Sequence, residues 1–110
     1  MPPLTEIKTV DNYSYMIYAS RTNPAEVKAV FQLSGGGISL GYLHFMADNV
    51  VLPKSKKLSG LFYFYYHESQ LASVIDILRN EKPIYLIFVD DESNNCRIST
   101  SMEPVGEGEN

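Results

Sequence analysis

Residues 61–89 decide the fold, and they read LFYFYYHESQLASVIDILRNEKPIYLIFV. The middle of this stretch is amphipathic, because its apolar residues recur at the spacing of one helix face. These residues are Leu71, Val74, Ile75 and Leu78. Ser69 can cap the first turn with its hydroxyl, and Asn80 can end the helix. We therefore expect one helix over residues 69–80, whose apolar stripe packs on another element.

Two strand-like segments flank this helix. Residues 61–66 and 84–89 are rich in aromatic or β-branched residues and have the length of strands. The second segment has no polar alternation, which predicts a central strand buried on both faces. A polar turn over residues 90–95 follows, and Ile98, Thr100 and Met102 then alternate with polar residues. This pattern predicts a closing hairpin whose second strand has one face in water.

The first half of the chain predicts further strands, over residues 4–10 and 13–19. Residues 26–33 are compatible with a helix or with a strand. Asn23 and Pro24 would start a helix well, whereas the alternation of the apolar residues is typical of a strand. A hairpin that turns at the three glycines 35–37 explains the whole stretch as far as Met46. A helix explains only its first part, so we favour the hairpin. Residues 48–60 have the composition of a loop.

The predicted fold class is α+β and mostly antiparallel β. We expect a curved sheet or a small barrel, packed against the one amphipathic helix near residues 69–80. A hairpin, a third strand, a helix and a final hairpin also follow one another in an OB-type barrel, which is an analogy of order alone. One compact domain over residues 1–103 is expected, followed by a flexible acidic tail over 104–110.

Composition excludes several classes of protein. The 110 residues include 13 acidic and nine basic ones, and the net charge of −4 argues against a strongly cationic nucleic-acid or membrane binder. The single cysteine, Cys96, permits neither an intramolecular disulfide nor a four-cysteine zinc site. No apolar run approaches the roughly 20 residues that cross a bilayer. Residues 1–6 lack the features of a signal peptide. We therefore expect a cytoplasmic protein without membrane contact.

No constellation of residues argues for catalysis. His44 and His67 are the only histidines, and nothing in their spacing requires a metal ion. Residues 90–92 are acidic, but they have the composition of a solvated turn. The glycines at 35–37 lack the lysine of a phosphate-binding loop. We expect no cofactor and no metal. An enzyme that pairs either histidine with Asp90 or Asp91 ranks last among the hypotheses.

The most unusual feature is a run of aromatic residues from Phe62 to Tyr66. On a strand, Tyr63, Tyr65 and His67 would share one face. Phe62 and every second residue after it would share the opposite face. If that face is exposed, it offers two tyrosines and a histidine to a partner, and tyrosine suits interfaces. The alternative is that both faces are buried, with the hydroxyls at the rim. The sequence leaves these two interpretations open.

The leading hypothesis is a small non-enzymatic protein-interaction module that self-associates as a dimer. Its expected contact residues are Tyr63, Tyr65, His67, Tyr42, Lys54, Lys56 and Lys57. The alternative is a ligand-binding β-barrel for single-stranded nucleic acid or a small molecule, in which the tyrosines stack and the lysines meet phosphate. Three lysines on an acidic protein supply few phosphate contacts, so nucleic acid is the less favoured partner.

Overall fold

The chain forms two sheets and one α-helix in a computed structural model that describes residues 4–20, 22–23, 25–91 and 95–100. The elements, in chain order, are β1 (Leu4–Val10), β2 (Asn12–Ile17), β3 (Val27–Gly35), β4 (Ile38–Met46), β5 (Lys56–Leu58), β6 (Leu61–His67), the 3-10 turn η1 (Glu68–Gln70), α1 (Leu71–Asn80), β7 (Ile84–Asp90) and β8 (Arg97–Thr100). The larger sheet has the order β2-β3-β4-β6-β5, and the smaller has the order β1-β7-β8. The predicted α+β class is confirmed.

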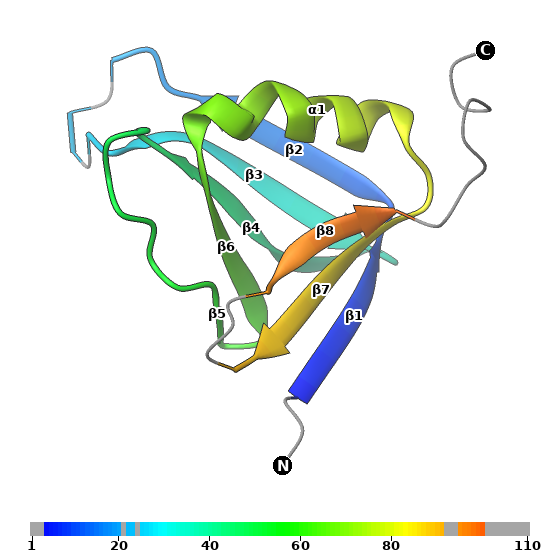
Figure 1. The fold of residues 1–110 in the computed structure, drawn as a ribbon. Helices are drawn as coiled ribbons and strands as arrows, with labels where there is room; N and C mark the ends of the chain where they lie inside the picture. The colour runs from blue at the N-terminus through cyan, green and yellow to red at the C-terminus, as the bar shows by residue number, and fades with distance from the viewer. Residues whose placement is uncertain (1–3, 21, 24, 92–94, 101–110) are drawn as a thin grey trace.

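The two sheets meet where β1 runs into β2 (Figure 1). β1 pairs with β7, whereas β2, just beyond Asp11, pairs with β3. At this junction the Asp11 N–H donates a hydrogen bond of 2.9 Å to the Ser34 carbonyl. The sheets are curved, but they do not close into a barrel. The curved-sheet form of the prediction is therefore the one that holds.

The core lies between the sheets and α1. Alternate residues of β3, β4 and β6 point into it, as the two-residue period of a strand requires. The largest side chains that are fully buried there are Phe31, Phe45, Phe62, Phe64, Leu33, Leu43 and Leu86. The helix adds Val74 and Leu78 to the same cluster, so the predicted apolar stripe is confirmed. We call the side of the larger sheet that faces this core its inner face, and the opposite side its outer face.

The hairpin over residues 26–46 is also confirmed. β3 and β4 pair antiparallel, and the chain turns at Gly36 and Gly37, whose φ angles are 61° and 78°. These values lie in the left-handed region, which glycine enters without steric cost. β4 and β6 are parallel neighbours, unlike all the other strand pairs in the described part of the chain.

Three local expectations need correction. The α-helix begins at Leu71 after a 3-10 turn, and the Ser69 N–H donates to the Asp48 carboxylate rather than the Ser69 hydroxyl capping the helix. β7 is central, but it is buried on one face and half-buried on the other. The predicted loop over 48–60 contains β5, which is too short to show a period. Met102 and the predicted tail over 104–110 lie outside the described residues.

Candidate functional site

Four aromatic rings gather on the outer face of the larger sheet. Tyr42 and His44 come from β4, and Tyr63 and Tyr65 come from β6. In the parallel pair, Tyr42 lies opposite Tyr63 and His44 lies opposite Tyr65. Their ring centroids are 5.4 Å and 5.3 Å apart, and both pairs are stacked. We call these four residues the tyrosine cluster.

The strand period explains why these rings point outward. Phe62 and Phe64 alternate with Tyr63 and Tyr65, and the phenylalanines take the buried side. The rings in the tyrosine cluster are half-buried, and they contact one another both along β4 and across to β6. α1 packs on the inner face and does not cover them. The sequence leaves open whether this face is exposed or buried. In the structure its rings are partly exposed, which lies between these two interpretations.

Lys56 extends the cluster at the edge of the sheet. It lies opposite Tyr63 in the antiparallel pair between β5 and β6. Its ammonium nitrogen is 5.8 Å from the centroid of the Tyr63 ring. A cation at this distance is attracted to the face of the ring, by about 0.5–1 kcal/mol at an exposed site. One predicted lysine therefore adjoins the tyrosine cluster.

The neighbouring lysine, Lys57, points to the other side of the sheet. Its ammonium nitrogen is 5.8 Å from the centroid of the inner-face ring of Phe62. It also donates to both carboxylate oxygens of Glu6, at 2.9 Å and 2.8 Å. Lys57 is therefore paired away from the cluster.

Lys54 is the third lysine of the predicted site. Together with Lys56 and Lys57, it lines a surface cavity of about 380 Å³. Glu6 and Asp90 line the same cavity. The charges there are mixed, so this cavity is not a purely cationic site for phosphate groups.

His67 has a structural contact instead of a free ring. Its Nε2 atom lies 2.8 Å from the Val50 carbonyl, which can only accept a hydrogen bond, so Nε2 carries the proton. Its backbone N–H donates to the Gln70 side chain over 3.1 Å. Through these two hydrogen bonds, His67 links the loop after β4 to the start of the helical segment.

His44 is the member of the cluster that sequence reasoning left out of the expected contact residues. Its alternation with Tyr42 was visible in the sequence, but its position opposite Tyr65 depends on the parallel pairing of β4 and β6. No local pattern predicts that pairing, because the two strands are separated by a loop and by β5.

The sheet that carries the cluster has an unusual charge pattern. None of the residues in β2, β3, β4, β5 and β6 is Asp or Glu, although the whole chain has 13 acidic residues. The same strands contain three lysines, Lys28, Lys56 and Lys57. An acidic protein thus presents a sheet free of carboxylates.

The described residues were also compared with the requirements of a metal site and of a membrane-spanning helix. No three side chains of His, Cys, Asp or Glu lie close enough together there to hold a metal ion. Cys96 is half-buried, with its sulfur 3.4 Å from the Val89 backbone nitrogen. Within the same residues, no helix has the length and hydrophobicity needed to span a membrane. Comparisons with protein families, curated proteins and solved structures found no match for this chain.

Proposed function

We propose that this protein is a small non-enzymatic interaction module that self-associates through the tyrosine cluster. The observation that carries the proposal is the set of four stacked rings on a sheet whose strands contain no carboxylate. Tyrosine combines an apolar ring with a polar hydroxyl, and it is enriched at protein interfaces. The half-buried rings are pre-organised by stacking, so a partner needs to order them little further.

Charge supports a second copy of the chain as the partner. Two copies with a net charge of −4 repel one another at long range. A contact between outer faces brings together strands that contain no carboxylate, so their side chains add no repulsion between acidic groups. A two-fold dimer would place the same cluster on both sides of the interface. We also propose a cytoplasmic location, with which the single cysteine, Cys96, is compatible because the chain needs no internal disulfide.

The test is the solution mass, measured by size-exclusion chromatography with light scattering at two salt concentrations. We expect a dimer for the natural chain and a monomer for the double variant Tyr63→Ser/Tyr65→Ser. Tyr85→Ser, on the smaller sheet, is the matched control and should remain dimeric. Circular dichroism checks that each variant is folded. An unchanged mass of the folded double variant would remove the cluster from the interface.

Single-stranded nucleic acid is a second candidate partner for the same face. The position of Lys56 over Tyr63 favours it, because a cation beside a stacking ring suits a phosphate next to a base. The test is fluorescence anisotropy with a labelled mixed-sequence oligonucleotide at low and high salt. Salt-sensitive binding that is lost in Tyr63→Ser would support this candidate. Absence of binding at low salt would eliminate it.

A further inference from the structure

β2 differs from the other edge strands of the two sheets. The edges are β2 and β5 in the larger sheet, and β1 and β8 in the smaller one. β1 carries Glu6 and Lys8, β5 has two lysines in three residues, and β8 is a four-residue strand with Arg97. Charges and short lengths of this kind protect edges from pairing with another chain. β2 has six residues, NYSYMI, with no charge and no proline.

The backbone of β2 has hydrogen-bonding groups that point away from β3, its one neighbour within the part of the chain that the structure describes. The Tyr18 N–H donates to the Lys28 carbonyl over 2.9 Å. In an antiparallel pair every second residue directs its backbone N–H and C=O to the neighbouring strand, so these residues are Tyr18 and every second residue before it. The N–H groups of Tyr15 and Ile17 therefore point outward. These two N–H groups are two residues apart along the strand, which is the spacing at which an added strand forms hydrogen bonds.

The side chains around this edge are apolar and exposed. Tyr15, Met16 and Ile17 have exposed fractions of 45%, 58% and 55%. Tyr15 and Ile17 lie on the inner-face side, where Tyr15 stacks on Phe31 with ring centroids 4.8 Å apart. Three consecutive exposed apolar residues on an unprotected edge predict a contact with another chain.

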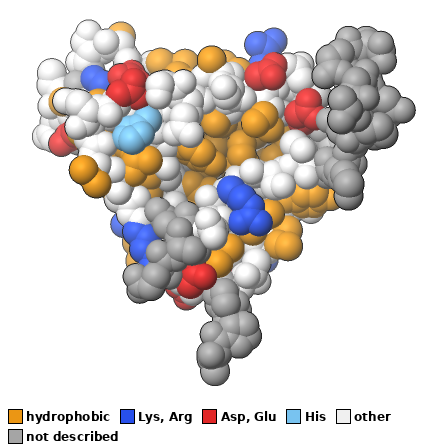
Figure 2. Space-filling model, in the orientation of Figure 1, with side chains coloured by type: hydrophobic (Ala, Val, Ile, Leu, Met, Phe, Trp, Pro, Cys, Tyr) orange, Lys and Arg blue, Asp and Glu red, His pale blue; other side chains and the backbone are white. Residues whose placement is uncertain are grey.

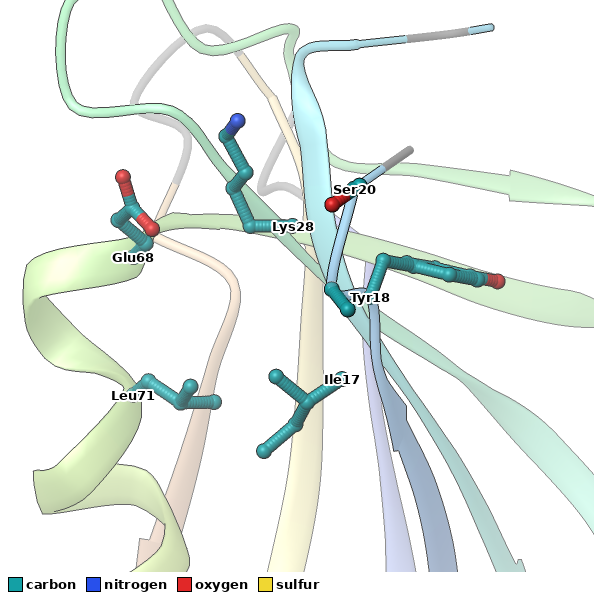
Figure 3. Close-up of a pocket in the computed structure, with 7 residues that line it drawn as sticks. Ile17, Tyr18, Ser20, Lys28, Glu68 and Leu71 are labelled. Atoms are coloured by element: carbon teal, nitrogen blue, oxygen red, sulfur yellow. The ribbon is translucent and has the colours of Figure 1, made fainter. Parts of the chain in front are cut away.

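Two cavities lie between β2 and the helical segment, one at each end. The first, of about 290 Å³, is lined by residues that include Ile17, Glu68 and Leu71. Figure 3 shows Ile17 of β2 and Leu71 of α1 pointing into the same opening from opposite sides. The second, of about 460 Å³, is lined by residues that include Tyr13 and Leu78. On the face that carries the helix, hydrophobic side chains gather below α1 (Figure 2).

We propose that the outer edge of β2 and these two cavities bind an extended peptide segment of a partner protein. We call this the α1–β2 site. The peptide adds to β2 as a further strand, so its backbone pairs with Tyr15 and Ile17. Alternate apolar side chains then point toward α1 and fill the cavities at its two ends. The ten residues of α1 span about 15 Å, which about five residues of an extended peptide cover.

The charges around the α1–β2 site define the chemistry of this peptide. In the first cavity Lys28 is accompanied by Glu68. In the second, two basic and two acidic side chains alternate along the chain with no excess of either sign, and these are Asp11, Arg79, Glu81 and Lys82. Balanced charges at both ends, with an uncharged strand between them, complement a segment without net charge. A polyanion such as nucleic acid does not fit this description.

This proposal is independent of the tyrosine cluster, because Tyr15 and Ile17 lie on the other side of the larger sheet. The test starts from a phage-displayed library of random heptapeptides, selected against the full chain. Affinities of the selected, labelled peptides are then measured by fluorescence anisotropy. We expect selected peptides to carry apolar residues at alternate positions, and Ile17→Pro to weaken their binding at least tenfold. Proline removes the outward N–H of Ile17, which β3 does not use.

A second measurement keeps the test valid if Ile17→Pro does not fold. The selected peptide should slow hydrogen exchange at the Tyr15 and Ile17 amides in the natural chain, as followed by NMR. The folded variant Tyr63→Ser/Tyr65→Ser is the control, and it should bind the peptide with unchanged affinity. Failure to enrich any peptide, or equal binding by folded Ile17→Pro, would overturn the proposal. Conversion of a dimer to a monomer by Ile17→Pro would assign the edge to a second copy and would also overturn it.

Discussion

Tyr42 and Tyr63 lie directly opposite each other in the parallel pair of β4 and β6, with ring centroids 5.4 Å apart and an interplanar angle of 28°. This contact joins strands that are separated in the sequence by a loop and by β5. The two rings belong to the proposed contact surface, and we expect their contact to stabilise the parallel pair as well.

A double-mutant cycle measures the stabilising part of this contact. We expect Tyr42→Ala and Tyr63→Ala to be coupled by about 0.5–1.5 kcal/mol in the free energy of unfolding, as stacked aromatic pairs are. Urea denaturation of the natural chain, both single variants and the double variant gives the value. Tyr42→Ala combined with Tyr85→Ala, in the other sheet, is the control and should be additive. Additive effects of Tyr42→Ala and Tyr63→Ala would show that the stacking contributes nothing.

Gly41 permits the close approach of β4 and β6 beneath this pair. It lies opposite Phe62, and a Cβ atom at this position would collide with the Phe62 carbonyl oxygen and lie 2.9 Å from the Phe62 nitrogen. We expect Gly41→Ala to destabilise the fold by about 3 kcal/mol, since backbone atoms cannot move aside cheaply. Gly36→Ala is the comparison, because its Cβ would meet open space at a positive φ. It should cost about 1–2 kcal/mol. Thermal unfolding followed by circular dichroism ranks the two, and equal losses would contradict this account.

The local elements of the fold could be predicted from the sequence because each has its own period. Leu71 and Leu78 repeat at helical spacing, and the glycines at 36 and 37 supply the φ angles of the hairpin turn. These signals arise from residues a few positions apart.

The arrangement of the candidate site could not be predicted, because it depends on pairing between distant strands. His44 joins the tyrosine cluster only through the parallel register of β4 and β6. Lys56 and Lys57 separate to opposite faces because they are neighbours on a strand, and the sequence gives three-residue β5 no recognisable period. The lysines expected to act together are therefore divided between two sides of the sheet.

Tyr66 of β6 forms a hydrogen bond with the backbone of β8, and its hydroxyl makes the stability of the fold depend on pH in the alkaline range. Its ring stacks on Phe45 at a centroid distance of 5.4 Å. Burial raises the pKa of the Tyr66 hydroxyl, and the neighbouring Cys96 raises it further, while a hydrogen bond with the Ile98 backbone acts in the opposite direction. Because the pKa is higher in the folded chain, the unfolded chain releases this proton first as the pH rises. The stability associated with Tyr66 is present below pH 10 or so and is lost above it.

Tyr66→Phe isolates this effect. At pH 8 the variant should be less stable by about 1 kcal/mol, because it lacks the hydrogen bond with Ile98. Above about pH 10 the difference should shrink, since only the natural chain loses stability through this hydroxyl. Urea denaturation at several pH values from 8 to 11 measures both quantities in both proteins. A difference that stays constant over this range would mean that the pKa of Tyr66 is the same in the folded and unfolded chains.

The ion pair between Lys57 and Glu6 links β5 of the larger sheet to β1 of the smaller one. Their atoms Nζ and Oε2 are 2.8 Å apart, and the side chains are 39% and 21% exposed. An ion pair open to water contributes little, so Lys57→Ala and Glu6→Gln should be coupled by no more than about 1 kcal/mol, and less at high salt. Lys56→Ala with Glu6→Gln is the matched cycle, and its coupling should be smaller, because Lys57 and not Lys56 forms the ion pair with Glu6. Urea denaturation at two salt concentrations measures both cycles. Equal coupling of the two lysines to Glu6 would contradict the placement of Lys56 beside the tyrosine cluster and of Lys57 at the junction between the sheets.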